Sequence, residues 1–180
     1  DSPTLYKAQT RILSGAQVHT EWGHWPKRGK ISSSPGNVQE DCCEVVFGIR
    51  KLELRPGKGM FLNGERTMFK GVCLHHDLGP LGAAVNRSAL RHNLSMLKDM
   101  GCNAIRTSHN MPAEDLVELC DSMGFMLMVE RFDEWDVPKC RNGYHRFFNE
   151  WAEKDMVNMI RHFRNNASVV MWSIGNEVPS

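Results

Sequence analysis

The chain has 180 residues, and 41% of them are hydrophobic, which excludes an intrinsically disordered polypeptide. Its 22 Lys and Arg residues are almost balanced by 21 Asp and Glu residues, so its charge gives no reason to expect nucleic acid or an acidic membrane surface as a partner. No apolar run approaches the roughly 20 residues that cross a bilayer, so we expect no membrane-spanning segment. The cellular location stays open.

Residues 1–48 differ in pattern from the rest of the chain. Two β-strands are predicted, over 5–13 and 43–47, and the connection over 23–36 is rich in Gly, Ser and Pro. Two strands and a long loop cannot bury a hydrophobic core by themselves. We therefore expect this part to be the end of an all-β domain that begins upstream of the sequence.

A β-hairpin is predicted next. Residues 51–55 alternate between polar and apolar, and residues 61–68 contain an Asn63-Gly64 pair that is typical of tight hairpin turns. From residue 69 onward, apolar strand patterns alternate with helical ones. Strands are predicted over 69–74, 103–107, 125–129 and 169–174, and helices from Ser88 to Gly101, from Pro112 to Gly124 and over 148–163.

This alternation predicts an α/β fold with a parallel sheet and right-handed crossovers. Four such units fit either half of an eight-stranded barrel or a small doubly wound sheet. A nucleotide-binding doubly wound sheet carries a Gly-rich phosphate turn after its first strand, and the segment 79–82 lacks the required spacing. The pattern therefore favours the barrel.

The six cysteines do not indicate a disulfide framework or a zinc site, because none forms a C-x-x-C pair. Cys73, Cys102 and Cys120 stand within apolar strand or helix patterns, which predicts that they are small buried hydrophobic residues. Trp151 and Trp172 also fall in patterns that predict burial.

Polar and charged side chains follow each of the four predicted strands. The carboxyl ends of parallel strands meet at one end of a barrel, where the connecting loops form the active site. Four consecutive strand ends with titratable or amide groups therefore predict a functional cavity. In chain order the groups are His75, His76 and Asp77; Arg106, Ser108, His109 and Asn110; Glu130, Arg131, Asp133, Glu134 and Asp136; and Asn176 and Glu177.

The fourth strand is the most informative, because its apolar run ends directly in Asn176 and Glu177. A carboxyl group at that place is costly to desolvate unless it is partnered or used. Arg, His and Asn side chains bind hydroxyl groups, as a sugar needs, and glycoside cleavage requires a carboxylic acid beside the leaving oxygen. Nucleophilic catalysis is less well supported, because Ser108 beside His109 lacks the context of a hydrolase serine and no cysteine lies at the predicted rim.

Six short motifs run in order through nearly the whole chain. They are Phe47-Gly-Ile-Arg50, Phe61-Leu-Asn-Gly64, Lys70-Gly-Val-Cys-Leu-His75, Asn103-Ala-Ile-Arg-Thr-Ser-His109, Leu119-Cys-Asp-Ser-Met-Gly124 and Trp172-Ser-Ile-Gly-Asn-Glu177. On these motifs the chain resembles glycoside hydrolase family 2, which contains multidomain β-galactosidases, β-glucuronidases and β-mannosidases. The resemblance implies an upstream sugar-binding β-sandwich, then an immunoglobulin-like β-sandwich that ends with residues 1–48, then a (β/α)₈ TIM barrel whose first half is residues 49–180.

The resemblance also implies roles for residues of the predicted rim. Glu177 would be the general acid/base of a retaining mechanism, and Asn176 would bind the hydroxyl group at carbon 2 of the sugar. The subsite for the non-reducing sugar would be lined or braced by His75, Arg106 and His109.

A metal site is not assigned. In some β-galactosidases of the family, a glutamate past the third strand and the acid/base glutamate help to hold magnesium. Glu134 falls at the first of these positions, but Asp136 falls where those enzymes have a histidine ligand. We therefore leave a metal unassigned, with the part of Glu134 in a metal site open, and expect no other cofactor.

The implied function is that of a retaining exo-β-glycosidase that hydrolyses terminal β-galactosides of oligosaccharides or glycoconjugates. The nucleophilic glutamate belongs to the seventh barrel strand and lies outside this chain, so we expect the fragment alone to be inactive. A β-glucuronidase or β-mannosidase of the same family, or an inactive sugar-binding fragment, are the alternatives. The expected partner is a carbohydrate with a terminal β-linked sugar, and assembly of the full-length protein into a homo-oligomer stays open.

Overall fold

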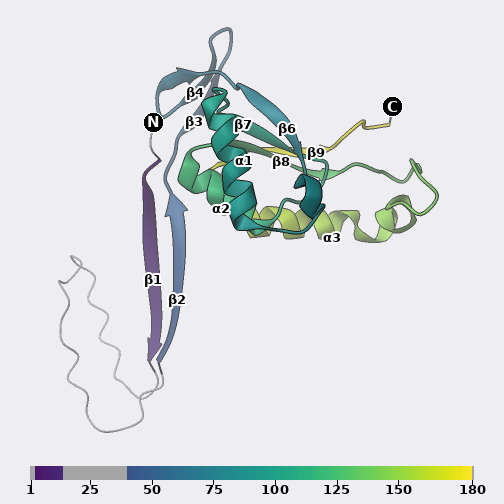
Figure 1. The fold of residues 1–180 in the computed structure, drawn as a ribbon, viewed down its shortest axis with the longest axis horizontal. Helices are drawn as coiled ribbons and strands as arrows, with labels where there is room; N and C mark the ends of the chain where they lie inside the picture. Colours follow the sequence, from purple (N-terminus) through teal and green to yellow (C-terminus); the bar gives the residue numbers. More distant parts are fainter. Residues whose placement is uncertain (1–2, 14–39, 180) are drawn as a thin grey trace, which may run out of the picture. The chain divides into compact units, whose positions relative to one another are not determined.

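The computed structural model describes residues 3–13 and 40–179 of the chain (Figure 1). The Gly-, Ser- and Pro-rich connection predicted over 23–36 lies outside the described residues. By its internal contacts the chain divides into two units, one of residues 7–46 and the other of residues 1–6 with 47–180, and each is described by itself.

The first two strands form a two-stranded sheet. β1 (Leu5–Leu13) and β2 (Glu40–Gly48) pair with each other, which confirms both strands predicted in this part of the chain. Apolar side chains such as Ile12 and Val46 are exposed, because a pair of strands has no core of its own. The assignment of residues 1–48 to an immunoglobulin-like sandwich stays a prediction.

A three-stranded antiparallel sheet follows, formed by β3 (Leu52–Arg55), β4 (Gly59–Leu62) and β5 (Glu65–Thr67). The predicted turn at Asn63-Gly64 is confirmed: it joins β4 to β5, and both of its residues have positive φ angles, of 52° and 88°. These are the angles of the type I′ turn, for which Asn-Gly is the preferred pair.

Four parallel strands alternate with helices in the remaining described residues. The strands are β6 (Gly71–His75), β7 (Ala104–Ser108), β8 (Met126–Phe132) and β9 (Val169–Gly175), and the helices are the 3₁₀ turn η1 (Gly79–Leu81), α1 (Arg87–Asp99), α2 (Glu114–Met123) and α3 (His145–Phe163). The strands lie side by side in chain order, β6-β7-β8-β9, and each neighbouring pair is parallel (Figure 1). A doubly wound sheet reverses its strand order at a switch point and a barrel does not, so the topology agrees with the predicted part of a barrel.

Two of the differences between observed and predicted element boundaries bear on the site and its surroundings. β8 continues to Phe132, further than the apolar run suggests, so Glu130 and Arg131 lie inside the strand rather than after it. α1 is capped by Asn86, whose side chain accepts a hydrogen bond from a backbone N–H of the first turn, and not by Ser88.

The main hydrophobic core lies between the parallel sheet and the helices. Alternate strand residues, such as Leu127 and Val129, are fully buried against Leu94, Leu119 and Phe163, which come from the three α-helices. Within the described ranges, no helix combines the length and the apolar character that crossing a bilayer requires.

The antiparallel sheet β3–β5 packs against the amino-terminal end of the parallel sheet. Met60 of β4 is buried there together with Ala104 and Met126, which begin β7 and β8. The carboxyl end of the sheet, where the predicted rim lies, is the opposite end. Structural packing and the candidate site therefore occupy different ends of the same strands, as is usual in barrels.

Several residues predicted to be buried are exposed. Cys120 is fully buried and Cys102 partly so, but Cys73 is exposed, because it lies on the face of β6 opposite to the residues that pack on the helices. Trp172 is 38% exposed because β9 is the edge strand of the described sheet, and Trp151, on the outer side of α3, is 44% exposed.

Candidate active site

Four of the five predicted site residues lie together at the carboxyl end of the sheet. Arg106 in β7, His109 just after it and Asn176 just after β9 belong to one hydrogen-bond network. The ring of His75, at the end of β6, meets the ring of His109 edge to face, with centroids 5.0 Å apart. Glu177 is outside this network and contacts a loop lysine instead.

Glu130 is the centre of the network. Its side chain is only 1% exposed, and its two oxygens accept hydrogen bonds of 2.7 and 2.8 Å from the guanidinium of Arg106. The hydroxyl of Ser173 in β9 and Nδ1 of His109 also contact it, at 2.7 and 2.6 Å. Burial acts to raise the pKa of Glu130, but the hydrogen bonds from its partners outweigh burial and hold the pKa below its ordinary value. The carboxylate is therefore ionised and orients the side chains around it.

The protonation pattern of His109 follows from this contact. An ionised carboxylate can only accept hydrogen bonds, so Nδ1 of His109 carries the hydrogen that Glu130 accepts. The other ring nitrogen, Nε2, is then the ring atom left to contact a ligand hydroxyl. Ser108 cannot use His109 as a base, because its own hydroxyl is buried and has no hydrogen-bond partner among the described residues.

The side chain of Asn176 is held at both ends. Its Oδ1 accepts a hydrogen bond of 3.1 Å from Arg106, and its Nδ2 donates one of 3.1 Å to Asp133. The bonds of Asp133 to Lys139 and Asn176 hold the pKa of the Asp133 carboxyl below its usual value. The amide of Asn176 thus has a fixed orientation.

The backbone around Asn176 is fixed as well. Its N–H donates to the carbonyl of Phe132 (2.7 Å), and its carbonyl accepts from the indole of Trp135 (2.8 Å). Gly175 allows this approach, since a Cβ atom at that position would lie 2.5 Å from the Phe132 carbonyl oxygen. The ends of β8 and β9 are therefore locked together directly beneath the candidate site.

Glu177, the predicted acid/base, lies in a different setting. Its backbone has a positive φ of 48°, which is uncommon for a residue with a side chain, and its side chain is 73% exposed. Its Oε2 is 2.9 Å from Nζ of Lys139. No apolar wall surrounds the carboxyl group within the described residues.

The loop after β8 is organised around Glu134, whose residue surface is 7% exposed. Its carboxylate accepts hydrogen bonds from the backbone N–H groups of Lys139 (2.6 Å), Cys140 (3.2 Å) and His145 (2.9 Å). Burial acts to raise the pKa of Glu134, but these bonds outweigh it and lower the pKa to about 2. Gly143 packs directly on the carboxylate, where any side chain would overlap the oxygens.

Other groups of the predicted rim serve the fold. Arg131 follows Glu130 in β8, so its side chain points to the opposite face of the sheet, where it pairs with Asp155 of α3 at 2.7 Å. Tyr144 donates a 2.5 Å hydrogen bond to the same Asp155 carboxylate. Burial and that bond raise the pKa of Tyr144 to about 12. After β6, His76 donates to a backbone carbonyl (2.9 Å) and the carboxylate of the next residue accepts from a backbone N–H (2.6 Å), so both stabilise the loop before α1.

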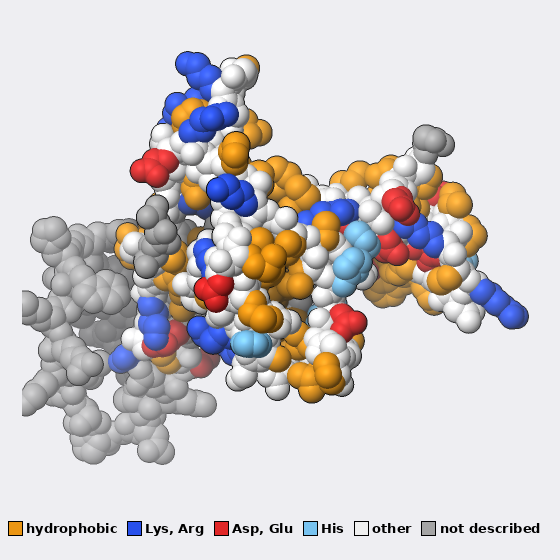
Figure 2. Space-filling view, turned by 45° about the horizontal axis from the view of Figure 1, so that its top comes forward, with side chains coloured by type: hydrophobic (Ala, Val, Ile, Leu, Met, Phe, Trp, Pro, Cys, Tyr) orange, Lys and Arg blue, Asp and Glu red, His pale blue; other side chains and the backbone are white. Residues whose placement is uncertain are grey.

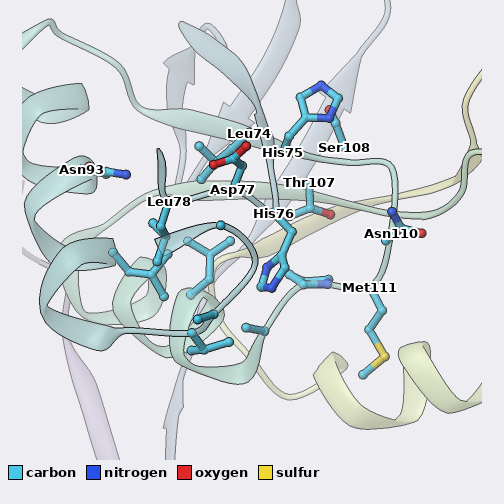
Figure 3. Close-up of a pocket in the computed structure, with 17 residues that line it drawn as sticks. Leu74, His75, His76, Asp77, Leu78, Asn93, Thr107, Ser108, Asn110 and Met111 are labelled. Atoms are coloured by element: carbon cyan, nitrogen blue, oxygen red, sulfur yellow. The ribbon is translucent and has the colours of Figure 1, made fainter. Parts of the chain in front are cut away.

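A small cavity lies beside the candidate site, between the loop after β6 and the loop after β7 (Figure 3). It has a volume of about 30 Å³, and most of its lining is apolar, including Leu74, Leu78 and Met111. Such a volume suits on the order of one water molecule. The cavity is therefore too small to hold a sugar ring.

Residues 52–180 match the family model described as "Glycosyl hydrolases family 2, TIM barrel domain". The chain belongs to glycoside hydrolase family 2.

Relatives within glycoside hydrolase family 2 carry different names. Over 142 residues the chain is 56% identical to "Beta-galactosidase BoGH2A" of Bacteroides ovatus, covering 77% of this chain and 17% of that protein. Over 180 residues it is 37% identical to a "Putative beta-glucuronidase" of Formosa agariphila, covering all of this chain and 15% of that protein. The crystal structure of a β-glycosidase from Bacteroides vulgatus has a TM-score of 0.76 and 46% identity, covering 82% of this chain and 19% of the other. The chain thus spans less than a fifth of the length of these relatives.

The magnesium position known from some members of glycoside hydrolase family 2 does not fit this chain. The carboxylate oxygens of Glu134 are already occupied by N–H donors, including Nδ1 of His145 at 3.2 Å. Glu177 pairs with Lys139, and Asp136 is exposed. In the part of the chain that the structure describes, no three His, Cys, Asp or Glu side chains are grouped so that they could hold a metal.

Sequence reasoning placed Glu130 and Asp133 in the predicted rim without a role, and it did not assign Ser173 or Lys139 to the site. Ser173 is paired with Glu130 in the register of β8 and β9, so the two side chains face the same side of the sheet. Lys139 lies in an irregular loop, far in sequence from Glu177, and its position carries no periodic signal. Its role follows only from the folded loop.

Proposed function

We propose that the chain is part of a retaining exo-β-glycosidase that hydrolyses terminal β-galactosides, with Glu177 as the general acid/base. In this proposal Asn176 binds the hydroxyl at carbon 2, and Arg106, His109 and His75 line or brace the subsite for the non-reducing sugar. The second carboxylate, the nucleophile, belongs to a part of the protein outside residues 1–180. Residues 1–48 are proposed to end an immunoglobulin-like domain, and residues 49–180 to form the first half of the barrel.

The observation that supports this function best is the rigid placement of Asn176 directly before Glu177. Two hydrogen bonds orient its amide, and two more hold its backbone at the junction of β8 and β9. In this proposal the sugar held by the Asn176 amide has its glycosidic bond beside Glu177. A carboxyl group at that place is positioned to give a proton to the leaving oxygen.

The reaction would proceed in two steps. Glu177, in its protonated form, gives its proton to the glycosidic oxygen, the bond between carbon 1 and that oxygen breaks, and the protonated leaving group departs. The nucleophilic carboxylate, which lies outside residues 1–180, bonds to carbon 1 and forms the covalent sugar–enzyme intermediate. The ionised Glu177 then removes a proton from water, which attacks carbon 1 and releases the sugar. Because a retaining enzyme needs its two carboxyl groups about 5–5.5 Å apart, the isolated chain is expected to be inactive.

A β-glucuronidase of the same family is the second candidate. Its support is that the relative that aligns with the whole of this chain is named as a putative β-glucuronidase. The name of the relative with 56% identity favours β-galactosidase. A β-mannosidase and a sugar-binding protein without activity are further alternatives, and neither has a specific observation in its favour.

The test is hydrolysis of 4-nitrophenyl β-galactoside, β-glucuronide and β-mannoside by the full-length enzyme that contains this chain. The same assays are made with the Glu177→Gln variant and with Glu153→Gln, a matched change at an exposed carboxylate of α3. We expect cleavage of the galactoside, a loss of about 10²–10⁴-fold in the Glu177→Gln variant for poor leaving groups, and no change in the Glu153→Gln variant.

Added azide sharpens the test, because it attacks the covalent intermediate without needing a general base. Azide should restore part of the activity of the Glu177→Gln variant on substrates with good leaving groups. Cleavage of the glucuronide alone would replace the galactosidase by the second candidate. Full activity of the Glu177→Gln variant on an unactivated disaccharide would refute the role of Glu177.

A further inference from the structure

Lys139 connects two parts of the candidate site that are otherwise separate. Its Nζ is 2.9 Å from Oε2 of Glu177 and 3.0 Å from Oδ1 of Asp133. Asp133 in turn accepts the hydrogen bond from the amide of Asn176. One ammonium group therefore bridges the proposed acid/base and the carboxylate that orients the proposed sugar-binding amide. Figure 2 shows acidic and basic side chains gathered in this region, at the right of the view.

The position of Lys139 is determined by the loop rather than by its own side chain alone. Its backbone N–H donates a 2.6 Å hydrogen bond to Glu134, which also binds two other backbone N–H groups of the loop. Gly143 leaves the space that the Glu134 carboxylate occupies. Because the backbone is tied down next to the site, the lysine stem has to span only a short, fixed distance to Glu177.

The contact uses one oxygen of Glu177 and leaves the other available. Lys139 binds Oε2, and among the described residues Oε1 has no hydrogen-bond partner. A general acid/base needs one oxygen directed at the leaving group. A carboxylate on an exposed, flexible side chain rotates unless a second group holds it, and such loss of orientation is costly in rate.

We propose that Lys139 is a positioning residue for Glu177, which fixes Oε2 so that Oε1 is directed at the glycosidic oxygen. This inference rests on the proposed function and adds a residue to it. Lys139 does not touch the reacting atoms and acts only through Glu177. Because it also binds Asp133, which binds the amide of Asn176, it fixes the position of Glu177 relative to that amide.

The test compares Lys139→Met with Lys139→Arg in the full-length enzyme. The methionine variant keeps the backbone N–H that binds Glu134 and loses only the charge, and the arginine variant keeps a charged donor. Two substrates of the sugar that the wild-type enzyme cleaves are used: a disaccharide, and a 2,4-dinitrophenyl glycoside, whose leaving group departs without a proton. Lys154→Met, a change at an exposed lysine of α3, is the matched control.

We expect Lys139→Met to lower kcat/KM for the disaccharide by roughly 10- to 100-fold and for the dinitrophenyl glycoside by less than about 3-fold, because only the first substrate needs the proton. Lys139→Arg should recover part of the loss, and Lys154→Met should behave as wild type. Equal losses on both substrates, with a lower Tm, would show a structural role and overturn the inference, as would no loss on either substrate.

Failure of this inference is distinguishable from failure of the proposed function. Glu177→Gln should lose more activity on the disaccharide than on the dinitrophenyl glycoside. If it does and Lys139→Met does not, the role of Glu177 stands and the role of Lys139 is refuted. If Lys139→Met does not fold, Gly143→Ala provides the second variant, since it displaces Glu134 and the loop without changing the lysine. The Gly143→Ala variant should then also lose more activity on the disaccharide than on the dinitrophenyl glycoside. Equal activity losses on both substrates in a folded Gly143→Ala variant would overturn the inference.

Discussion

Two glutamates of the candidate site, Glu130 and Glu177, have opposite surroundings. Glu130 is 1% exposed and accepts hydrogen bonds from a guanidinium, a hydroxyl and an imidazole. Glu177 is 73% exposed and is held by one lysine through one oxygen. The first carboxylate has every oxygen occupied by side chains of the protein, and the second keeps an oxygen for something else.

This difference separates a carboxylate that organises the hydrogen-bond network from the one that we propose as the reacting group. A buried carboxylate surrounded by donors is stabilised in its ionised form and has no reason to take up a proton. A general acid must gain and lose a proton in each turnover, so its surroundings must tolerate both forms. Glu177, the general acid in our proposal, is exposed and has a single charged partner, Lys139.

The largest effect on stability is expected when Glu130 is changed. Glu130→Gln leaves the guanidinium of Arg106, whose side chain is 30% exposed, without its carboxylate, and losing hydrogen bonds between charged groups in this way costs about 1.5–3 kcal/mol. Urea unfolding of the barrel in the full-length enzyme measures this loss. Glu153→Gln, on the surface of α3, should stay within about 0.5 kcal/mol of wild type. A small loss in the Glu130→Gln variant would mean that Glu130 and Glu177 differ less than their burial indicates.

A smaller, pH-dependent effect is expected at Glu134, which is bound by backbone N–H groups instead of charged side chains. Its pKa is lowered from 4.5 to about 2, so the ionised carboxylate stabilises the folded loop above pH 4.5, and this contribution is lost as the pH falls towards 2. The Glu134→Gln variant should melt at a lower temperature than wild type near neutral pH. The difference between the two melting temperatures should shrink from pH 4.5 downward.

The control for this titration is Glu150→Gln, a change at an exposed glutamate of α3. Its melting temperature should follow that of wild type at every pH. A difference between Glu134→Gln and wild type that stays constant from pH 6 to pH 3 would contradict the lowered pKa, because both proteins would then respond to acid in the same way.

Hydrophobic periodicity predicts most of the fold. The strands and helices from residue 69 onward are present in the predicted order, because each is defined by local alternation of apolar residues that pack into one core. The end of β8 was predicted wrongly since Glu130 interrupts the apolar run. Its charge is compensated by Arg106 and Ser173, which lie on neighbouring strands and far away in sequence. The residue pattern of one strand carries no information about partners on other strands.

The site was predictable only where it coincides with a strand end. His75, His109 and Asn176 follow that rule, and the structure brings them together with Arg106. Lys139 does not follow it, because its place depends on how an irregular loop folds around one buried carboxylate. The sequence pattern thus identifies the site residues at strand ends, whereas the contribution of the loop after β8 is seen only in the three-dimensional structure.

The smallest effect is expected at Ser173, whose hydroxyl donates one hydrogen bond to Glu130. Ser173→Ala removes that bond but leaves the contacts of Glu130 with Arg106 and His109, so the free energy of unfolding should fall by about 1 kcal/mol. Ser95→Ala, on the surface of α1, is the control and should change stability by less than that. In a Glu130→Gln background the same serine change should cost almost nothing, because residues of one network are not additive. An undiminished cost in that background would show that Ser173 stabilises the sheet by itself, and Glu130 would then no longer be the centre of the network.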